Sequence, residues 1–557
     1  MKPLDMTEAL SPYLRPGRGR ALVWGLILVV AGIGGGVSAQ AQQANVPTLR
    51  PEAPPAIGAS ATGAALPRGP AAGRPETAAL PPNPDPTIGT AAVPQPLDIT
   101  DANRYRQIFD LQRQGQFREA ELLMGWLNDH RLMGHVLAQR YLHAAYPASY
   151  RELASWLAIY ADHPESLRIY TMALKRRPAG AAPPRKPEVD LFRTGTPDSS
   201  VIAADPHWQA GLAAWRRANL SGAASAFELA ASARNGNDWD IAAAAYWAAR
   251  AHLKNREPAK VSIWLRQAAQ YPRTFYGQLA RRALGLDSDF NWAAKPMSDA
   301  SARALALSGK GQRALALLEI GELSLAEQEM QSLLRSAGPD LAAGLHAMAQ
   351  LYQLPSISLG LGVLAERQGS IHADSDLYPV PHWQPAGGFT LDRALLFALV
   401  RQESAFNVSA ENPSGAAGLM QLMPATARAV GGRRQDLHDP LLNLALGQKY
   451  LQRLLADPAV DNNLFMMAIA YNAGPGTLAK WRAANATSDP LLFVESLPKN
   501  ETRNFVERVM ANIWIYQERF GQPTPSLDHV AAGGWPIYQS QDGFTAASNA
   551  PTASGSN

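Results

Sequence analysis

Glu403 is the first residue in the sequence whose surroundings suggest chemistry. It follows an unbroken apolar run, ALLFALV at positions 394–400, within the stretch ALLFALVRQESAFN. Such a run predicts a buried helix, so the carboxyl group would lie where that helix leaves the core. Partial burial disfavours the ionised form and raises the pKa, as a general acid near neutral pH requires. The alternative is a solvated charge at a helix end, paired with Arg401.

The stretch NPSGAAGLMQLMPATARAVGG (412–432) combines glycines with a directed amide. Gly415 and Gly418 allow the backbone to pass close to another group, because glycine has no Cβ atom. Gln421 offers an amide beside them, and Pro424 is predicted to be the first residue of a new helix.

The stretch MMAIAYNAGPG (466–476) predicts an apolar helix that is broken at Gly474 and restarts at Pro475. Tyr471 and Asn472 stand at the end of the first helix, beside the tight turn. This pattern presents a hydroxyl and an amide at a helix end, where they could reach a ligand.

The stretch LPKNETRNFVERVMANIWIYQERF (497–520) predicts an amphipathic helix with Glu501 in its first turn. An acidic residue there also complements the helix dipole without any further role. Taken alone, this stretch therefore leaves both interpretations of Glu501 open.

Four motifs carry a resemblance to a known family. RQESAFN, GAAGLMQLMPATA, AYNAGPG and ETRNFV, in this order and at this spacing, resemble the catalytic domain of the soluble lytic transglycosylases. These are lysozyme-like enzymes that cleave peptidoglycan. Each motif alone is weak, but together they are specific. The helical sequence upstream, joined through LYP at 377–379, is similar to the superhelix of the doughnut-shaped family members, whereas the first hundred residues show no such resemblance.

The resemblance implies a lysozyme-like α-helical domain with a saccharide groove and Glu403 as its sole catalytic carboxylate. Glu403 would protonate the glycosidic oxygen between N-acetylmuramic acid and N-acetylglucosamine. It would then act as base on the C6 hydroxyl of the muramic residue, which attacks its own C1 and leaves a 1,6-anhydromuramoyl end. Tyr471 would lie within hydrogen-bonding reach of Glu403. The implied substrate-binding residues are Gln421, Met423, Tyr471, Asn472 and Glu501.

A single carboxylate fits this reaction better than ordinary glycoside hydrolysis. Retaining and inverting glycosidases need two carboxylates, and the nearest acidic residue after Glu403 is Glu411. One carboxylate suffices when the nucleophile is a hydroxyl of the substrate itself, held close to the anomeric carbon. Two alternatives stay open: a muramidase that uses water, and a non-catalytic wall-binding scaffold. The scaffold would be expected to lack Glu403 or Tyr471.

Asn412 departs from the family pattern, in which serine often occupies this place. An asparagine side chain can replace a hydroxyl in a hydrogen bond to the backbone. We therefore expect altered loop detail and retained activity.

The N-terminus predicts export. Arg15, Arg18 and Arg20 precede an apolar run at 21–37, and Ala39-Gln40-Ala41 fits a cleavage site. This order of basic, apolar and small residues is typical of a secretory signal peptide, which predicts a periplasmic protein. A retained inner-membrane anchor is the alternative.

Composition divides the remainder and predicts an all-α protein. Twelve of the residues 51–100 are proline, which favours a disordered linker. Ala- and Leu-rich helical units of roughly 30 to 40 residues follow and predict a helical-hairpin solenoid. The solenoid could guide glycan strands or bind other cell-wall enzymes. The predicted segments are a signal peptide (1–41), a disordered linker (42–103), the solenoid (104–373), the lysozyme-like domain (374–521) and a disordered tail (522–557).

Charge and composition exclude several other classes of function. The formal net charge of +4 over 557 residues does not argue for a nucleic-acid partner. The chain has no cysteine, which excludes disulfides, thiolate metal sites and cysteine nucleophiles. The histidines show no metal-ligand spacing, and there is no phosphate loop or nucleophile elbow. We predict neither a metal nor a cofactor, and peptidoglycan as the partner.

Overall fold

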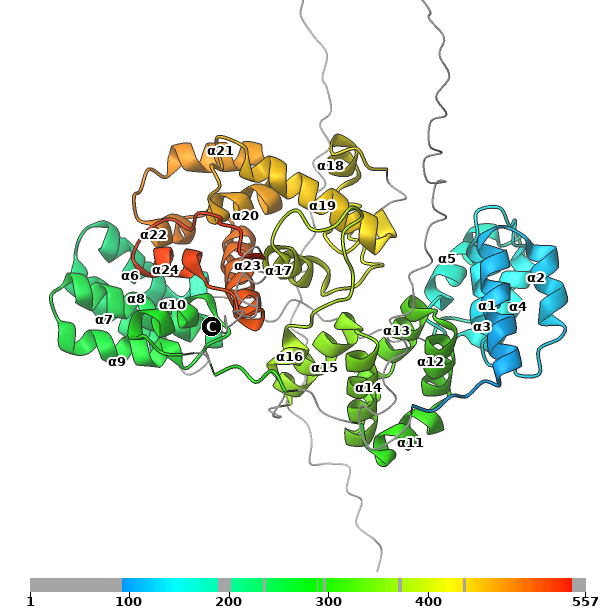
Figure 1. The fold of residues 1–557 in the computed structure, drawn as a ribbon. Helices are drawn as coiled ribbons and strands as arrows, with labels where there is room; N and C mark the ends of the chain where they lie inside the picture. The colour runs from blue at the N-terminus through cyan, green and yellow to red at the C-terminus, as the bar shows by residue number, and fades with distance from the viewer. Residues whose placement is uncertain are drawn as a thin grey trace, which may run out of the picture. The chain divides into compact units, whose positions relative to one another are not determined.

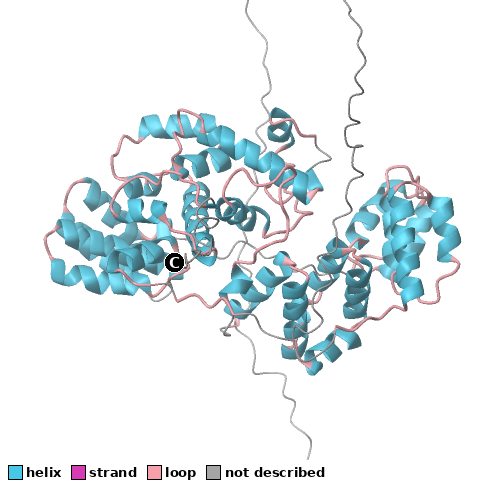
Figure 2. Cartoon of the chain, viewed as in Figure 1, coloured by secondary structure: helices cyan, strands magenta, loops and turns pink. Residues whose placement is uncertain are grey.

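The computed structural model contains helices joined by loops. Within its described residues there is no strand, only isolated β-bridges (Figure 2). The prediction of an all-α protein is confirmed. The predicted signal peptide, and the predicted linker up to residue 92, lie outside the described residues. The structure describes residues 93–188, 202–233, 237–287, 289–293, 297–368, 373–433 and 437–542.

The first part of the described chain, which we call the helical region, runs from α1 to α15. The helices from α6 to α10 each pack against the next, as do those from α11 to α13, as expected for helical hairpins (Figure 1). Its elements are α1 (Ile99–Arg113), α2 (Phe117–Met124), α3 (Met133–Leu142), α4 (Tyr150–Tyr160), α5 (Ser166–Arg176), η1 (Ile202–Ala204), α6 (Pro206–Arg216), α7 (Leu220–Ala231), α8 (Asp238–Lys254), α9 (Pro258–Ala269), α10 (Phe275–Leu284), α11 (Asp299–Leu307), α12 (Gly309–Ile320), α13 (Leu323–Gln331), η2 (Leu334–Ser336), α14 (Pro339–Leu351) and α15 (Pro355–Arg367).

Helix α8 shows why this composition forms closely packed helices. The run of alanines 242–245 is buried, and side chains this small let neighbouring helices approach. Trp247 of the same helix is fully buried against Phe227 of α7, with ring centroids 5.7 Å apart. Small residues therefore bring the helices together, and large aromatic residues fill the space that remains.

The boundary between the predicted linker and the helical region needs correction. Helix α1 begins at Ile99 rather than after residue 103, because the Asp98 side chain caps it by accepting from Thr100 N and Asp101 N. Leu97 is buried, and its backbone N–H donates to Glu319 over 3.2 Å. The end of the predicted linker is thus packed structure.

The second part, which we call the C-terminal domain, is built around α23. Every residue of this helix from Thr502 to Gln517 is buried. Helix α17, the apolar helix that carries Glu403, packs along it (Figure 1). The helices of this domain are α16 (Asp374–Leu377), α17 (Arg393–Ser404), α18 (Pro424–Ala429), α19 (Pro440–Leu455), α20 (Leu464–Ala473), α21 (Pro475–Ala484), α22 (Pro490–Glu495), α23 (Asn500–Arg519) and α24 (Pro525–Ala531).

The prediction of a disordered tail from residue 522 is wrong for residues 522–542. Pro525 begins helix α24, and Leu527 and Val530 of that helix are buried. Tyr538 N donates to the Asn462 carbonyl over 2.8 Å, which joins the segment after α24 to the domain. Proline and serine, read as signs of disorder, here start a helix. Residues 543–557 lie outside the described residues.

None of the described helices is both long and apolar enough to cross a bilayer.

Candidate active site

Glu403 lies in the last turn of α17. The body of this helix, from Ala394 to Val400, is buried, whereas Glu403 itself is only partly exposed. The helix ends abruptly because Ala405 and Phe406 adopt left-handed backbone conformations, with φ of 50° and 65°. Such conformations are strained for residues with a Cβ atom and occur often at functional sites. The buried ring of Phe406 anchors this reversal of the chain.

Arg401 is not the partner of Glu403. Its Nε donates to the Leu377 carbonyl over 2.7 Å, and its Nη1 donates to Asn512 Oδ1 over 3.2 Å. The guanidinium also lies over the ring of Tyr378, 4.4 Å from the centroid. Among the described residues, the Glu403 carboxyl has no hydrogen-bond or ion-pair partner. The interpretation of Glu403 as a paired helix-end charge is therefore wrong.

The surroundings of Glu403 favour its protonated form. Burial, and to a smaller extent the nearby charge of Glu501, raise the pKa of Glu403 to about 8. A carboxyl group with this pKa keeps its proton at neutral pH and can donate it. The predicted increase in pKa and its predicted cause are confirmed.

Asn412 organises the loop that follows α17. Its Oδ1 accepts a hydrogen bond of 3.0 Å from Ala416 N, and its carbonyl accepts one of 2.9 Å from Gly415 N. The expected hydrogen bond from the Asn412 side chain to the backbone is therefore confirmed. Gly415, with φ of 86°, adopts the left-handed conformation that this turn needs.

Asn443 of α19 holds the next part of the loop and was missed from the sequence. Its Oδ1 accepts from Met420 N over 2.9 Å, and its Nδ2 donates to the carbonyls of Ala417 and Leu437 over 3.1 and 2.8 Å. The side chain is fully buried. Gly418 packs so closely here that a Cβ atom would lie 1.9 Å from the Leu437 carbonyl oxygen.

Gln421 and Met423 end this loop. The Gln421 amide nitrogen donates to the carbonyls of Ala410 and Gly418, over 3.1 and 2.9 Å, so its amide oxygen is left to accept from a ligand. The φ of Gln421 is 43°, so it is strained in the same way as Ala405 and Phe406. Met423 is 41% exposed and precedes Pro424, which is the first residue of α18 as predicted.

Tyr471 contacts the loop rather than Glu403. Its hydroxyl donates to the Met420 carbonyl over 2.7 Å, so the expected hydrogen bond to Glu403 is replaced by one to the backbone. The ring is stacked on Phe505, with centroids 6.3 Å apart. Burial, followed by the charge of Glu403, raises the pKa of Tyr471 well above its ordinary value. Tyr471 is therefore a neutral hydrogen-bond donor near Glu403.

Helices α20 and α23 bring Asn472 and Thr502 together, and Glu501 precedes Thr502 on α23. Asn472 Oδ1 accepts a hydrogen bond of 2.7 Å from Thr502 Oγ1, which fixes the amide at the end of α20. Glu501 is exposed, and its charge reaches Glu403. Thr502 was missed, because no local pattern links it to a residue thirty positions earlier.

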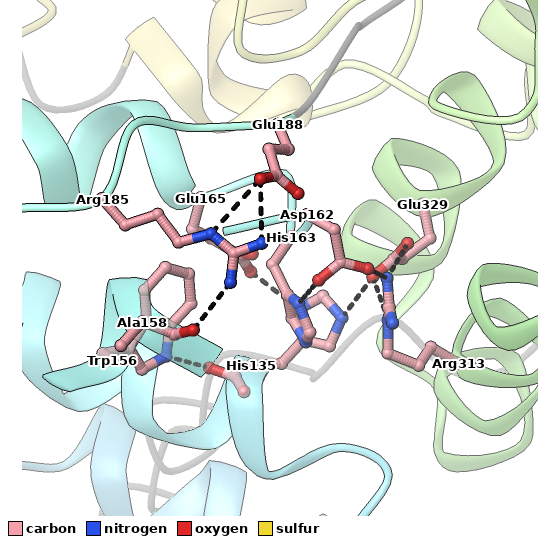
Figure 3. A network of polar contacts seen from close by, with 11 residues as sticks. His135, Trp156, Ala158, Asp162, His163, Glu165, Arg185, Glu188, Arg313 and Glu329 are labelled. Carbon is pink, nitrogen blue, oxygen red and sulfur yellow. Dashed lines mark hydrogen bonds and ion pairs between the residues drawn. The ribbon is translucent and has the colours of Figure 1, made fainter. Parts of the chain in front are cut away.

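Two buried histidines and a buried glutamate of the helical region lie close enough to be considered as metal ligands. His135, His163 and Glu329 place potential ligand atoms within 4.8 Å of one another, which the histidine spacing in the sequence does not predict. The cluster is already paired by charge (Figure 3): His135 Nδ1 lies 2.8 Å from Glu165 and its Nε2 lies 2.9 Å from Glu329. Arg313 Nε donates to Glu329 over 2.6 Å.

The protonation of His135 follows from these contacts. Burial alone would lower the pKa of His135, but the charges of Glu165 and Glu329 raise it to about 9. Both ring nitrogens are then donors, and neither keeps the lone pair that a metal ligand needs. We therefore interpret the set as a buried ionic cluster of the helical region.

Comparison with known families agrees with the motifs. A family described as "Transglycosylase SLT domain" matches residues 384–493. This range contains every candidate site residue except Glu501, which lies just beyond it.

Two relatives have the same name. The soluble lytic murein transglycosylase of Escherichia coli strain K12 is 29% identical over 294 residues, which cover 50% of this chain and 44% of the relative. The protein of this name from Salmonella typhimurium is 36% identical over 148 residues, 24% of this chain and 22% of the relative. The chain thus spans less than half the length of these relatives.

Two solved structures align with about three quarters of this chain. The 70 kDa soluble lytic transglycosylase of Escherichia coli is 22% identical with a TM-score of 0.48, covering 77% of this chain and 72% of that one. An inactive mutant of the lytic transglycosylase from Pseudomonas aeruginosa is 20% identical with a TM-score of 0.46, covering 76% and 71%. The C-terminal part of the chain thus matches the transglycosylase SLT domain family, and the chain is similar in sequence to soluble lytic murein transglycosylases over up to half of its length.

Proposed function

We propose that this protein is a peptidoglycan lytic transglycosylase. The observation that carries the proposal is Glu403: a partly exposed carboxyl without a partner among the described residues, with a pKa raised to about 8, inside a transglycosylase SLT domain. A general acid needs both a proton at neutral pH and access to its substrate, and Glu403 has both.

The proposed reaction uses one carboxyl group twice. Glu403 donates its proton to the glycosidic oxygen as the bond from that oxygen to C1 of N-acetylmuramic acid breaks. The carboxylate then removes the proton of the C6 hydroxyl, whose oxygen bonds to C1. The proton returns to Glu403, and the products are a 1,6-anhydromuramoyl end and a free N-acetylglucosamine hydroxyl. Holding C6–OH and C1 together inside the substrate replaces a second catalytic carboxylate.

The other predicted residues have roles that their contacts allow. Gln421 would accept a hydrogen bond from a sugar through its amide oxygen, because its amide nitrogen already binds the loop. The exposed thioether of Met423 would pack against a sugar face. Asn472 and Glu501 would bind hydroxyl or amide groups along the groove, and Tyr471 would hold the loop at Met420.

Hydrolysis is a second candidate because of Glu501. The sequence motif around Glu403 offers no second carboxylate, but α23 brings Glu501 close enough for its charge to affect Glu403. An ordinary glycosidase uses such a second carboxylate as nucleophile or as base for water. The product distinguishes the two mechanisms, since hydrolysis leaves a reducing end and transglycosylation leaves an anhydro end.

The site of action and the domain limits belong to the same proposal. The predicted signal peptide (1–41) places the reaction in the periplasm, where peptidoglycan is found. We propose residues 374–521, extended by the packed segment to residue 542, as the catalytic domain. Residues 104–373, extended back to α1, form the helical domain. Its proposed partners are glycan strands or other cell-wall enzymes.

The proposal is tested on purified peptidoglycan sacculi with the full chain. The wild type is expected to release soluble muropeptides, and Glu403→Gln is expected to release none above background. Glu411→Gln serves as the matched control, because Glu411 is exposed in the same loop and has no proposed role. Release by Glu403→Gln at the wild-type rate would show that another group is the acid.

A further inference from the structure

Helix α22 of the C-terminal domain is held at its N-terminal end by the helical region. Asp489 caps α22 and also accepts two contacts, of 3.0 and 2.9 Å, from Arg250 Nη2 of α8. The Arg250 guanidinium lies 4.9 and 4.4 Å from the ring centroids of Trp215 and Trp247. Stacking of this kind restricts the planar guanidinium before it pairs with a carboxylate.

The C-terminal end of α22 is held by a second buried contact. Glu495, its last residue, accepts a hydrogen bond from the hydroxyl of Tyr276 on α10. That hydroxyl in turn accepts a bond of 3.0 Å from Trp247 Nε1. Tyr276 and Trp247 are almost completely buried. Where water is excluded, a lost partner in such a chain is not replaced.

Glu495 also faces the first turn of α23. Arg503 Nε lies 3.7 Å from Glu495 Oε2 and 3.7 Å from Glu507 Oε1, and all three residues are buried. Burial raises the pKa of both acids, although the charge of Arg503 lowers it at both, that of Arg216 at Glu495 and that of Arg508 at Glu507. Burial, followed by the charge of Glu495, raises the pKa of Glu507 well above its ordinary value. We assign the proton of the pair to Glu507, whose pKa lies well above its ordinary value, so that Glu495 is the charge facing Arg503.

The two residues before Arg503 belong to the candidate active site. Thr502 donates to Asn472 over 2.7 Å, and the charge of Glu501 reaches Glu403. Glu501, Thr502 and Arg503 lie within a single helical turn. Any rotation of this turn that displaces Arg503 also displaces the other two.

We infer that Tyr276, Glu495 and Arg503 are positioning residues, through which the helical region fixes the first turn of α23. None of them is expected to touch substrate; they set the orientation of Glu501 and Thr502. The effect on activity rests on the proposed function. The positioning itself is a property of α23 and can be measured without substrate.

Two tyrosine variants of the full chain test the inference. Tyr276→Phe removes only the hydroxyl that binds Glu495. Tyr246→Phe is the matched control, because Tyr246 is buried in α8 with its ring 5.3 Å from that of Tyr276. Tyr276→Phe is expected to increase hydrogen–deuterium exchange in the peptide 497–505 and to lower kcat on sacculi about tenfold, since small misplacements of site groups have effects of this size. Tyr246→Phe is expected to do neither.

Two isosteric swaps test the assignment of the buried proton. In Glu507→Gln the side-chain amide remains a neutral donor to Glu495. This variant is expected to show wild-type hydrogen–deuterium exchange in the peptide 497–505 and a wild-type kcat. Glu495→Gln removes the charge opposite Arg503 and is expected to match Tyr276→Phe. Equal effects of the two swaps would contradict the assignment.

The outcomes separate this inference from the proposed function. Wild-type exchange of the peptide 497–505 in Tyr276→Phe would overturn the inference, whatever the activity. If the wild type forms no anhydro product, the proposed function fails, and the exchange data still decide whether α10 positions α23.

Discussion

Glu403 shows how the environment of one residue defines the chemistry of the site. The carboxyl group has no partner in the described part of the chain, and both burial and the charge of Glu501 favour its protonated form. Arg401, the one cation in its own motif, is turned away to Leu377 and Asn512. If Arg401 paired with Glu403, its positive charge would lower the pKa of Glu403, and the carboxyl group would have no proton to donate at neutral pH.

The raised pKa of Glu403 predicts a measurable effect on stability. In the unfolded chain a glutamate titrates near pH 4.3, whereas folded Glu403 holds its proton up to about pH 8. The folded state therefore binds more protons between these values, and the chain loses stability as the pH rises from one to the other. Glu403→Gln cannot ionise and is expected to be more stable than the wild type at pH 9 by roughly 1 to 3 kcal/mol. Thermal unfolding of both proteins at pH 4 and at pH 9 measures this gain in stability. A stability difference between the two proteins that is equal at the two pH values would contradict the prediction.

Glu501 predicts a shift in the pH profile. Glu501→Gln removes a nearby negative charge, so the pKa of Glu403 is expected to fall and the loss of kcat/KM at high pH should begin at lower pH. Because Glu501 is exposed, the shift is expected to be below about one pH unit and to shrink in high salt. The readout is the pH at which kcat/KM begins to fall on the high-pH side. The absolute value of kcat/KM is not used, because the substitution is also expected to raise KM. An unmoved limb would show that Glu501 does not tune the acid.

Two glycines in the loop after α17 are expected to differ in how much their substitution lowers the stability of the protein. Gly415 and Gly418 both have positive φ, of 86° and 78°. A Cβ atom added to Gly415 would have no other atom within 4 Å, whereas one added to Gly418 would lie 2.3 Å from Asn443 Nδ2. Gly415→Ala is expected to lose about 1 kcal/mol from backbone strain, and Gly418→Ala roughly 3 kcal/mol or more. Denaturant unfolding compares them, and equal losses would contradict the packing described for Asn443.

The helices of the site could be predicted from the sequence because their signals are local. The apolar run ending near Glu403, the proline that starts α18, and Gly474 between α20 and α21 each appear in the structure as expected. Asn443 and Thr502 could not be predicted, since their partners are far away in the chain. The sequence of residues 522–542 predicts disorder, because its few apolar residues reveal their role only when α24 packs.

The buried ionic cluster gives a prediction at the scale of the whole helical region. His135 of α3 joins Glu165 to Glu329 of α13, a residue 194 positions further along. Since the folded pKa of about 9 exceeds the unfolded value near 6.5, this stabilisation is complete below pH 6.5 and is lost as the pH rises through about 9.

Replacing His135 removes the central cation of this cluster. His135→Leu leaves two carboxylates without their common partner and is expected to lose about 3 to 5 kcal/mol at pH 6, with a smaller difference at pH 10. His130→Leu, at an exposed position, is the control. Thermal unfolding at both pH values measures the difference, and a loss that does not depend on pH would mean that His135 acts through packing alone.

The most direct test of the proposed mechanism is the chemical identity of the new glycan end. Sacculi are digested with the wild type, and the soluble products are analysed by mass spectrometry with and without borohydride reduction. We predict muropeptides one water lighter than hydrolysis products, with masses that borohydride leaves unchanged, and none of them with Glu403→Gln. Ends that gain two hydrogens on reduction would contradict the account, because they would show that water, and not the C6 hydroxyl, attacks C1.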